Sequence, residues 1–219
     1  FKIGRKLGQS GILDIFSKFH ELPKSIKILF YLLSFSLKKK SEVNYNIDEK
    51  ERLSNSLQSM GTTFIKLGQF LATRPDIIGE DLSNQLETLQ DKLPPFSLSQ
   101  AQNIIKKDLG DQMFNSIINI SEPVAAASIA QVHKAQIDDN GTIKDVAVKI
   151  LRPEIKKIFN DEIDALMFFA FVIESLIKKT KRLKLVEVTF LLKQITNHEM
   201  DLRFEAAAAN EYAENTKND

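Results

Sequence analysis

A lysine on a predicted β-strand could bind an anion. The strand comprises Val146, Ala147, Val148 and Lys149, and it follows an Asn-Gly pair at residues 140–141 that is a strong hairpin signal. Side chains alternate between the two faces of a strand, so Ala147 and Lys149 share one face. If the strand is half-buried, the lysine must leave the core or meet an anion. A lysine that is merely solvated at a sheet edge is the alternative.

A stretch of small residues, 123–129, lies between two strand-like runs and contains Ala125, Ala126 and Ala127. Such a loop lets backbone N–H groups approach an anion, as the glycine-rich loop over ATP phosphates does in protein kinases. Because alanine resists positive φ, this loop should be stiffer than a glycine loop. Lys149, one hairpin later, looks like the kinase strand lysine that holds the α and β phosphates. A tight turn that binds no ligand is the alternative.

A helix predicted from about Leu53 to Thr73 carries two stripes of residues spaced three and four apart. The apolar stripe, expected to be buried, comprises Leu57, Met60, Phe64, Leu67 and Leu71. The polar stripe comprises Thr62, Lys66, Gln69 and Thr73. Lys66 and Gln69 lie about one turn apart, so they can present a cation and an amide to one target. The polar stripe is a candidate functional face, with plain solvation as the alternative.

Charged residues gather at 199–205, before an alanine-rich helix. Glu199 and Asp201 would lie about 200° apart on a regular helix, so they serve different partners unless the helix only starts there. Asp201 shares a face with Glu205. Glu199 shares one with Arg203, an arrangement that also fits a simple intrahelical ion pair.

The elements that must position these residues indicate an α+β protein. Helices are expected over 51–110, broken at 74–76 (Arg, Pro, Asp) and again at Pro94 and Pro95, because proline cannot continue the helical hydrogen-bond ladder. The predicted strands are 117–120, 129–137 and 143–151. After Pro153 the pattern is helical again, through 165–177 and then 186–215.

Composition excludes several kinds of site. The 219 residues include 30 basic and 29 acidic side chains, and this balance argues against a general nucleic-acid binder. Cysteine is absent, which excludes disulfides and thiolate sites, and the three histidines, His20, His133 and His198, are too scattered for a local metal motif. No stretch reaches the roughly 18 apolar residues of a membrane-spanning helix. The apolar run 28–37, flanked by lysines, could lie at an anionic membrane surface or be a buried helix.

Taken in order, the motifs resemble the UbiB family, atypical protein-kinase-like proteins linked to ubiquinone biosynthesis. The matching residues are Lys66, Leu67, Gly68 and Gln69 for the family's KxGQ motif, Ala125–Ser128 for its alanine-rich loop, Lys149 for its strand lysine, and Glu199 with Asp201 for its ExD motif. The resemblance covers about residues 50–219, and four ordered motifs are far more specific than any one of them. Thr62 stands where many relatives carry proline.

The resemblance implies a protein-kinase-like N-lobe, a small antiparallel sheet plus helices, with a helical N-terminal extension. It implies three regions: a basic and apolar segment with a linker (1–49), a helical extension with the KxGQ motif (50–110), and the N-lobe with an inserted helical pair (111–219). The expected cofactor is ATP with Mg²⁺. The metal ligands and the catalytic loop are expected in a C-terminal part outside this sequence, so the chain is read as the N-terminal part of a longer kinase-like phosphotransferase or ATPase, without catalytic residues of its own.

The resemblance also implies roles for residues. Lys149 would contact the phosphates and pair with Glu205. The helix that carries Lys66 and Gln69 would cover the place where a kinase receives its protein substrate, with Glu199 and Asp201 facing it, so these four residues would be regulatory. The residues expected to bind the nucleotide are Val124, Ala125, Ala126, Ala127, Ser128, Ile129, Ala130, Gln131, Val132, Lys149 and Glu205.

Partners and location follow from the resemblance as well. A lid over the site implies a small-molecule or lipid substrate, such as a quinone precursor, or ATPase activity, in place of protein phosphorylation. We expect ubiquinone-biosynthesis proteins as partners, no nucleic acid, and the cytoplasmic face of a bacterial inner membrane, with the mitochondrial inner membrane as the alternative. Two other functions stay open: a non-catalytic scaffold that docks a biosynthetic enzyme, and a peripheral membrane adaptor built on residues 26–40.

Overall fold

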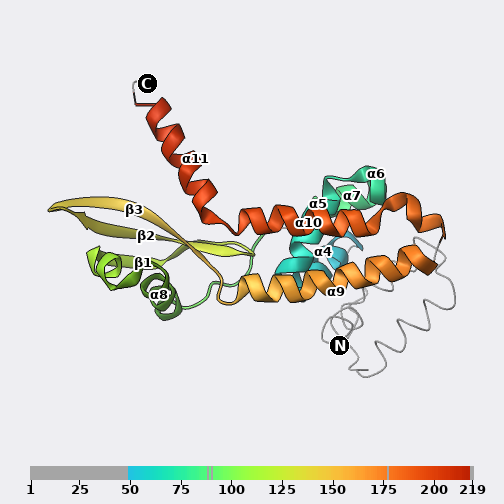
Figure 1. The fold of residues 1–219 in the computed structure, drawn as a ribbon, viewed down its shortest axis with the longest axis horizontal. Coiled ribbons are helices and arrows are strands. Elements are labelled where there is room, and N and C mark those ends of the chain that lie inside the picture. Colours follow the sequence, from blue (N-terminus) through green and yellow to red (C-terminus); the bar gives the residue numbers. More distant parts are fainter. Residues whose placement is uncertain (1–48, 88, 90, 177, 218–219) are drawn as a thin grey trace. The chain divides into compact units, whose positions relative to one another are not determined.

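The computed structural model describes residues 49–217 except 88, 90 and 177, so the N-terminal segment 1–49 lies outside it apart from Glu49. The described residues form helices and one small antiparallel sheet, which confirms the predicted α+β class (Figure 1). They divide into a helical unit, which contains residues up to 91 and residues 159–193, and a sheet unit, which contains residues 92–158 and 194 onward. Each unit combines two stretches of chain, so this division differs from the predicted ranges 50–110 and 111–219.

The helical unit contains two groups of helices. The first group comprises α4 (Glu49–Met60), α5 (Thr62–Ala72), α6 (Pro75–Ile78) and α7 (Glu80–Leu86), of which α4, α5 and α7 pack together. The second comprises most of α9 (Ile155–Leu176), the 3-10 helix η1 (Lys178–Leu183) and most of α10 (Leu185–Glu199). Lys193 Nζ on α10 lies 2.7 Å from Asp164 Oδ1 on α9, and Figure 1 shows α9 and α10 running side by side. These two helices correspond in position to the inserted helical pair that the family resemblance implies.

The single helix predicted from Leu53 to Thr73 is wrong, because the chain breaks at Gly61. Gly61 has φ 98°, which favours glycine, and it forms the N-cap of α5. Leu57, Met60 and Phe64 are buried as predicted, while Leu67 and Leu71 are half-buried. The break also changes the polar stripe: Thr62, the first residue of α5, is only 7% exposed, so it belongs to the packed interior. Helix α5 ends at Ala72, and Pro75 is the first residue of α6, so the helices break beside the proline as predicted.

Gly68 permits close packing inside the helical unit. A Cβ at this position would lie 2.5 Å from Cδ2 of Leu89 and 2.9 Å from Cδ1 of Leu57, and both leucines are buried. Leu86 Cδ2 would be 3.8 Å away, in ordinary contact. Glycine in the KxGQ sequence therefore has a packing role, apart from any role of its neighbours.

The sheet unit is built on a meander. Strands β1 (Ile117–Ala126), β2 (Ala130–Asp139) and β3 (Thr142–Leu151) pair antiparallel in the order β1-β2-β3. Asn140 and Gly141 form the predicted two-residue hairpin with φ 54° and 88°, the left-handed pair of a type I′ turn. Strand β1 is longer than the predicted 117–120, since it continues through Pro123 to Ala126 with irregular register against β2.

One face of this sheet is covered and the other is open. Helix α8 (Leu98–Ser116) begins with a capping box formed by Ser97 and Gln100 and packs Ala101 and Ile105 against Ile150 of β3. Cross-strand pairing sets Val132 opposite Lys149 and Lys134 opposite Ala147, so these four residues share the other face. Helix α11 (Leu202–Asn215) follows α10 and has no buried residue.

We predict that Gly68→Ala destabilises the helical unit. Alanine normally stabilises a helix interior by about 1 kcal/mol relative to glycine, but here the added methyl group must displace two packed leucines, at a cost of about 1–3 kcal/mol. Urea unfolding followed by circular dichroism should show a net loss of about 1 kcal/mol. In a Leu89→Ala background the same change should cost less, because the nearer of the two obstructing methyl groups is gone and only Leu57 must move. A stabilised Gly68→Ala protein with Leu89 intact would contradict this packing role.

Candidate functional site

Lys149 forms an ion pair with Glu205. Its Nζ atom lies 2.6 Å from Glu205 Oε2, which joins β3 to the first turn of α11 within the sheet unit. This is the contact that the family resemblance implies. The lysine side chain is 35% exposed and the glutamate side chain 60%, so the pair contributes little to stability. It does orient the ammonium group on the open face of the sheet, where further N–H donors of Lys149 can meet an anion.

The turn between β1 and β2 is shorter than the predicted alanine-rich loop. Ala125 and Ala126 belong to β1, and only residues 127–129 connect the strands. Ala127 N–H donates to the carbonyl oxygen of Ala130 across 2.8 Å and closes the turn. Val124 is 66% exposed, whereas Ser128, Ile129 and Ala130 are buried. Among the predicted nucleotide-binding residues, the side chains of Val124 and Ala125 are therefore the exposed ones in this stretch.

Arg152 fastens this turn to the preceding proline segment. Its Nε and Nη2 atoms donate to the carbonyl oxygen of Ala127, at 2.9 and 2.7 Å. The same guanidinium donates to the carbonyl oxygens of Pro94 and Leu93, at 2.9 and 3.1 Å. Arg152 N–H also donates to Ile129 O. A planar guanidinium can satisfy several carbonyl groups at fixed angles, so Arg152 sets the position of the turn.

Gln131 supports the turn from the covered face of the sheet. Its Oε1 accepts from Phe96 N–H at 3.0 Å, and its Nε2 donates to Phe96 O at 3.1 Å. Its other amide proton meets His133 Nε2 at 2.8 Å, while His133 Nδ1 lies 2.8 Å from Ser121 O. These contacts assign the ring proton to Nδ1. Gln131 is 1% exposed and its side-chain amide is engaged in these hydrogen bonds, so it positions the strand, and its predicted contact with a nucleotide stays a prediction.

The Glu199–Glu205 region is a helix junction. The helix predicted over 186–215 ends at Glu199, and Asp201 forms the N-cap of α11, with Oδ1 accepting from Arg203 N–H. Arg203 also donates to both carboxylate oxygens of Asp201, at 2.7 and 2.5 Å, so the predicted Glu199–Arg203 pairing gives way to this one. Hydrogen bonding from Arg203 lowers the pKa of Asp201 to about 2. Because the junction separates Glu199 from Asp201, the two acids do not lie on one regular helix.

The regulatory residues of the extension lie in the helical unit. Lys66 Nζ lies 3.7 Å from Asp91 Oδ2, and its side chain is 12% exposed, so the polar stripe is not simply solvated. Gln69 is half-buried on the same helix. Glu199 and Asp201 belong to the sheet unit, so the proposed meeting of Lys66 with these acids stays a prediction.

The described residues contain neither a metal-ligand cluster nor a membrane-spanning helix. Residues 49–217, apart from 88, 90 and 177, contain no group of three His, Cys, Asp or Glu side chains that could hold a metal ion. None of the helices in this part of the chain is both long and apolar enough to cross a membrane.

Comparison with known proteins decides the family. The sequence profile of the ABC1 atypical kinase-like domain matches residues 88–219, more than half of the chain. This chain belongs to the UbiB family of atypical kinase-like proteins. The chain is 36% identical over 207 residues to a probable protein kinase UbiB from Marinobacter nauticus, covering 94% of this chain and 37% of that protein. A probable protein kinase UbiB from Azotobacter vinelandii is 38% identical over 165 residues, 75% of this chain and 30% of that protein.

This UbiB-family chain spans about a third of the length of the curated relatives it matches. No solved structure matches it. Family membership confirms the resemblance drawn from the KxGQ sequence, the alanine-rich stretch, Lys149 and the ExD sequence, and the small sheet with helices confirms the kinase-like N-lobe. Within the sheet unit, the fold brings Lys149, Glu205 and the 127–129 turn onto one three-stranded scaffold.

Sequence reasoning missed the positioning residues. Arg152 follows a strand and precedes Pro153, and nothing in this spacing indicates that its partners are carbonyl groups about 60 residues upstream. The family resemblance places Gln131 among the nucleotide-binding residues, and the sequence gives no signal for the hydrogen bonds of His133. One available signal was the polar pair Gln131 and His133, which alternation places on the same face as the apolar Ala135.

Replacing Arg152 with lysine tests its positioning role. Arg152→Lys keeps the charge but cannot reach carbonyl groups on both segments, so we expect a loss of about 1–3 kcal/mol in the free energy of unfolding and faster amide hydrogen exchange at residues 127–129. Arg203→Lys is the matched control, because the Arg203 side chain is 89% exposed, and it should leave exchange at the turn unchanged. If amide hydrogen exchange at residues 127–129 is equal in the wild-type and Arg152→Lys proteins, Arg152 does not position the turn.

The depressed pKa of Asp201 predicts an acid-resistant cap on α11. The folded pKa of about 2 lies below the ordinary value, so the contribution of the carboxylate is present above the ordinary value and is lost as the pH falls toward 2. An NMR titration of the Asp201 carboxyl should have its midpoint near that pKa of about 2. Arg203→Gln should raise the midpoint toward the ordinary aspartate value of about 3.9. A midpoint unchanged by this substitution would show that Arg203 is not the cause.

Proposed function

We propose that this chain is the ATP-binding N-terminal part of an atypical kinase-like or ATPase protein that supports ubiquinone biosynthesis. The observation that carries the proposal is the 2.6 Å ion pair between Lys149 and Glu205 on the open face of the sheet. Kinase-like proteins use such a pair to hold a lysine against the nucleotide phosphates. The relatives are named probable protein kinases, which agrees with this proposal.

In the proposed complex, the residues of the sheet unit have different roles in binding the nucleotide. Lys149 supplies the cation, and Glu205 restrains it, because a lysine side chain otherwise samples many rotamers. Arg152 donates two hydrogen bonds to the carbonyl oxygen of Ala127 and so fixes the 127–129 turn. The turn therefore needs little reorganisation when a ligand binds. Val132 lies opposite Lys149 on the same face and offers an apolar surface beside the cation.

ATP supplies the transferable phosphoryl group, and the residues of this chain bind and orient the nucleotide. The described residues contain no carboxylate cluster for Mg²⁺, so we assign the metal no ligand within them. The activity, the acceptor, the biosynthetic partners and the membrane location of the whole protein are part of the proposal, because the chain spans about a third of its relatives.

Lys149→Ala in the full-length protein should weaken ATP binding at least about tenfold, since it removes a charge-assisted contact with the phosphates. Lys134→Ala is the matched control: Lys134 is an exposed lysine on the same sheet face, and its loss should change the affinity by less than about threefold. Calorimetric titration with ATP measures both, and circular dichroism checks the fold. Equal affinities of the Lys149→Ala and wild-type proteins would refute the nucleotide assignment.

A second readout separates an enzyme from a scaffold. The same variants are expressed in cells that lack the endogenous gene, and their ubiquinone content is measured. We expect Lys134→Ala to restore ubiquinone and Lys149→Ala to fail. If Lys149→Ala lost ATP binding but still restored ubiquinone, the protein would act as a scaffold in this pathway.

A further inference from the structure

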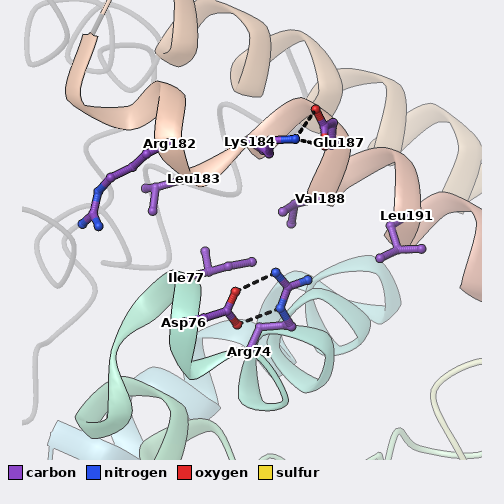
Figure 2. Close-up of a pocket in the computed structure, with 9 residues that line it drawn as sticks. All are labelled: Arg74, Asp76, Ile77, Arg182, Leu183, Lys184, Glu187, Val188 and Leu191. Atoms are coloured by element: carbon purple, nitrogen blue, oxygen red, sulfur yellow. Dashed lines mark hydrogen bonds and ion pairs between the residues drawn. The ribbon is translucent and has the colours of Figure 1, made fainter.

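A pocket in the helical unit is lined by none of the residues assigned to the nucleotide. Its volume is about 350 Å³, near the lower end of the range for small-molecule sites. Two segments line it: the start of α6, and the stretch from the end of η1 into α10. The lining residues are Arg74, Asp76, Ile77, Arg182, Leu183, Lys184, Glu187, Val188 and Leu191, drawn in Figure 2.

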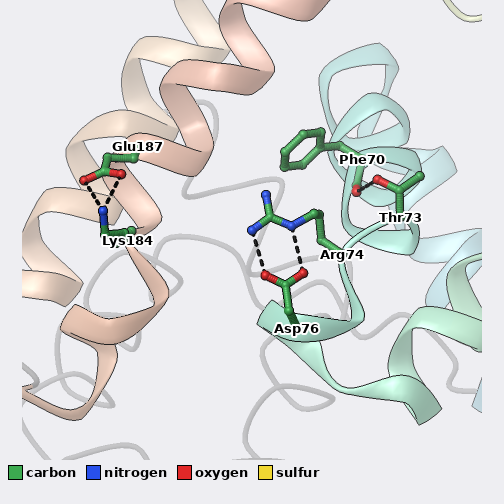
Figure 3. Close-up of polar contacts among 6 residues, drawn as sticks. All are labelled: Phe70, Thr73, Arg74, Asp76, Lys184 and Glu187. Carbon is green, nitrogen blue, oxygen red and sulfur yellow. Dashed lines mark hydrogen bonds and ion pairs between the residues drawn. The ribbon is translucent and has the colours of Figure 1, made fainter.

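Both acids of this pocket are already neutralised. Arg74 donates to both carboxylate oxygens of Asp76, at 2.8 and 2.7 Å, and these bonds lower the pKa of Asp76. Lys184 Nζ donates to both oxygens of Glu187, at 3.1 and 2.9 Å. Figure 3 shows the two pairs on the separate segments. The charges of these four residues cancel, so an anionic ligand meets no unpaired carboxylate.

Arg182 is the charged lining residue that belongs to neither of these two ion pairs. The described residues offer it no acid within ion-pair distance, and its side chain belongs to an exposed residue. The pocket therefore carries one net positive charge. A guanidinium binds carboxylate and phosphate through two parallel hydrogen bonds, so this charge favours a ligand with one such group.

The rest of the lining is apolar. Ile77 and Leu183 are half-buried, Val188 is 8% exposed and Leu191 is 39% exposed. In Figure 2, Arg182 lies at one end of the row of lining residues and Leu191 at the other, with Ile77 and Val188 between them. A cation at one end and uncovered apolar surface toward the other match an elongated ligand with an anionic head and an apolar body.

The wall on the α6 side is held in place by local hydrogen bonds. Thr73 Oγ1 donates to Phe70 O at 2.8 Å, and Arg74 N–H donates to Leu71 O at 2.9 Å, which ends α5 directly before the pocket (Figure 3). Ser83 Oγ donates to Ala72 O and ties α7 to the same turn. Arg74 thus has a fixed backbone, and its bidentate bond with Asp76 fixes its side chain. A pre-formed wall lowers the cost of ordering on binding.

We propose that this pocket binds a small amphipathic anion, with its carboxylate or phosphate group on Arg182 and its apolar body against Leu183, Val188 and Leu191. The proposal uses only residues of the helical unit and does not depend on the nucleotide assignment. It adds a small-molecule site within the region that the family resemblance treats as a regulatory extension.

The test titrates the full chain with octanoate and octyl phosphate, and with octanamide as a neutral probe of the same length, by isothermal calorimetry. Acetate and inorganic phosphate serve as head groups without an apolar body. We expect the two anionic octyl probes to bind saturably, the neutral amide to bind about tenfold more weakly, and the short anions more weakly still. The ratio of the octanoate and octyl phosphate affinities shows which head group the site prefers.

Two variants locate the binding. Arg182→Gln should weaken the anionic probes about tenfold and leave octanamide unchanged, while the matched control Lys181→Gln, on the same 3-10 helix outside the pocket lining, should change neither by more than about twofold. Leu191→Ser should reduce the gain in affinity from acetate to octanoate. Both altered side chains are exposed, and circular dichroism checks that the fold is kept. The proposal is overturned if neither octyl anion binds saturably, if octanamide binds as tightly as octanoate, or if Arg182→Gln and Lys181→Gln have equal effects.

Discussion

The ion pair between Lys149 and Glu205 is the contact on which the account of the sheet unit depends. Helix α11 buries none of its residues, so little apolar surface holds it to the sheet. The pair itself is partly exposed, and such pairs contribute at most about 1 kcal/mol. Moving α11 therefore costs little free energy, so a phosphate group that attracts Lys149 can shift the helix. A lysine tied weakly to a loosely packed helix suits ligand binding better than it suits structural support.

The 127–129 turn, in contrast to α11, is held by several hydrogen bonds. Arg152 and Gln131 hold the 93–96 segment, the turn and β2 together through hydrogen bonds in which donors and acceptors are matched. Buried polar groups of this kind are costly to leave without partners, so the network specifies one arrangement. In the kinase fold a glycine-rich loop bends over the phosphates. In this UbiB-family chain, alanines and an arginine clamp hold the turn, whereas α11 has no buried residue to hold it.

Several features of the fold could be predicted because their causes are local. Asn140 and Gly141 adopt the left-handed conformations that the hairpin needs. Pro75 is the first residue of α6, and Pro94 and Pro95 lie in the non-helical stretch between α7 and α8, in keeping with the missing N–H donor of proline. The ion pair of Lys149 was predicted from the family rather than from spacing, since its partner comes from a distant helix.

The features that escaped prediction depend on contacts between distant residues or on a single dihedral angle. Gly61 interrupts a run of helical periodicity that otherwise continues across it, and an isolated glycine is tolerated in helices, so the pattern alone favoured one helix. The partners of Arg152 and Gln131 are backbone atoms, which carry no sequence signal. The pocket around Arg182 joins residues more than 100 positions apart, and it becomes visible only when the helices are placed in three dimensions.

The central claim is that Lys149, held by Glu205, meets the nucleotide phosphates on the open face of the sheet. A crystal structure of the full-length protein with a non-hydrolysable ATP analogue and Mg²⁺ tests it most directly. The account predicts a phosphate oxygen within hydrogen-bond distance of Lys149 Nζ, beside the 127–129 turn. An analogue bound elsewhere, with Lys149 contacting only Glu205 or solvent, would contradict it.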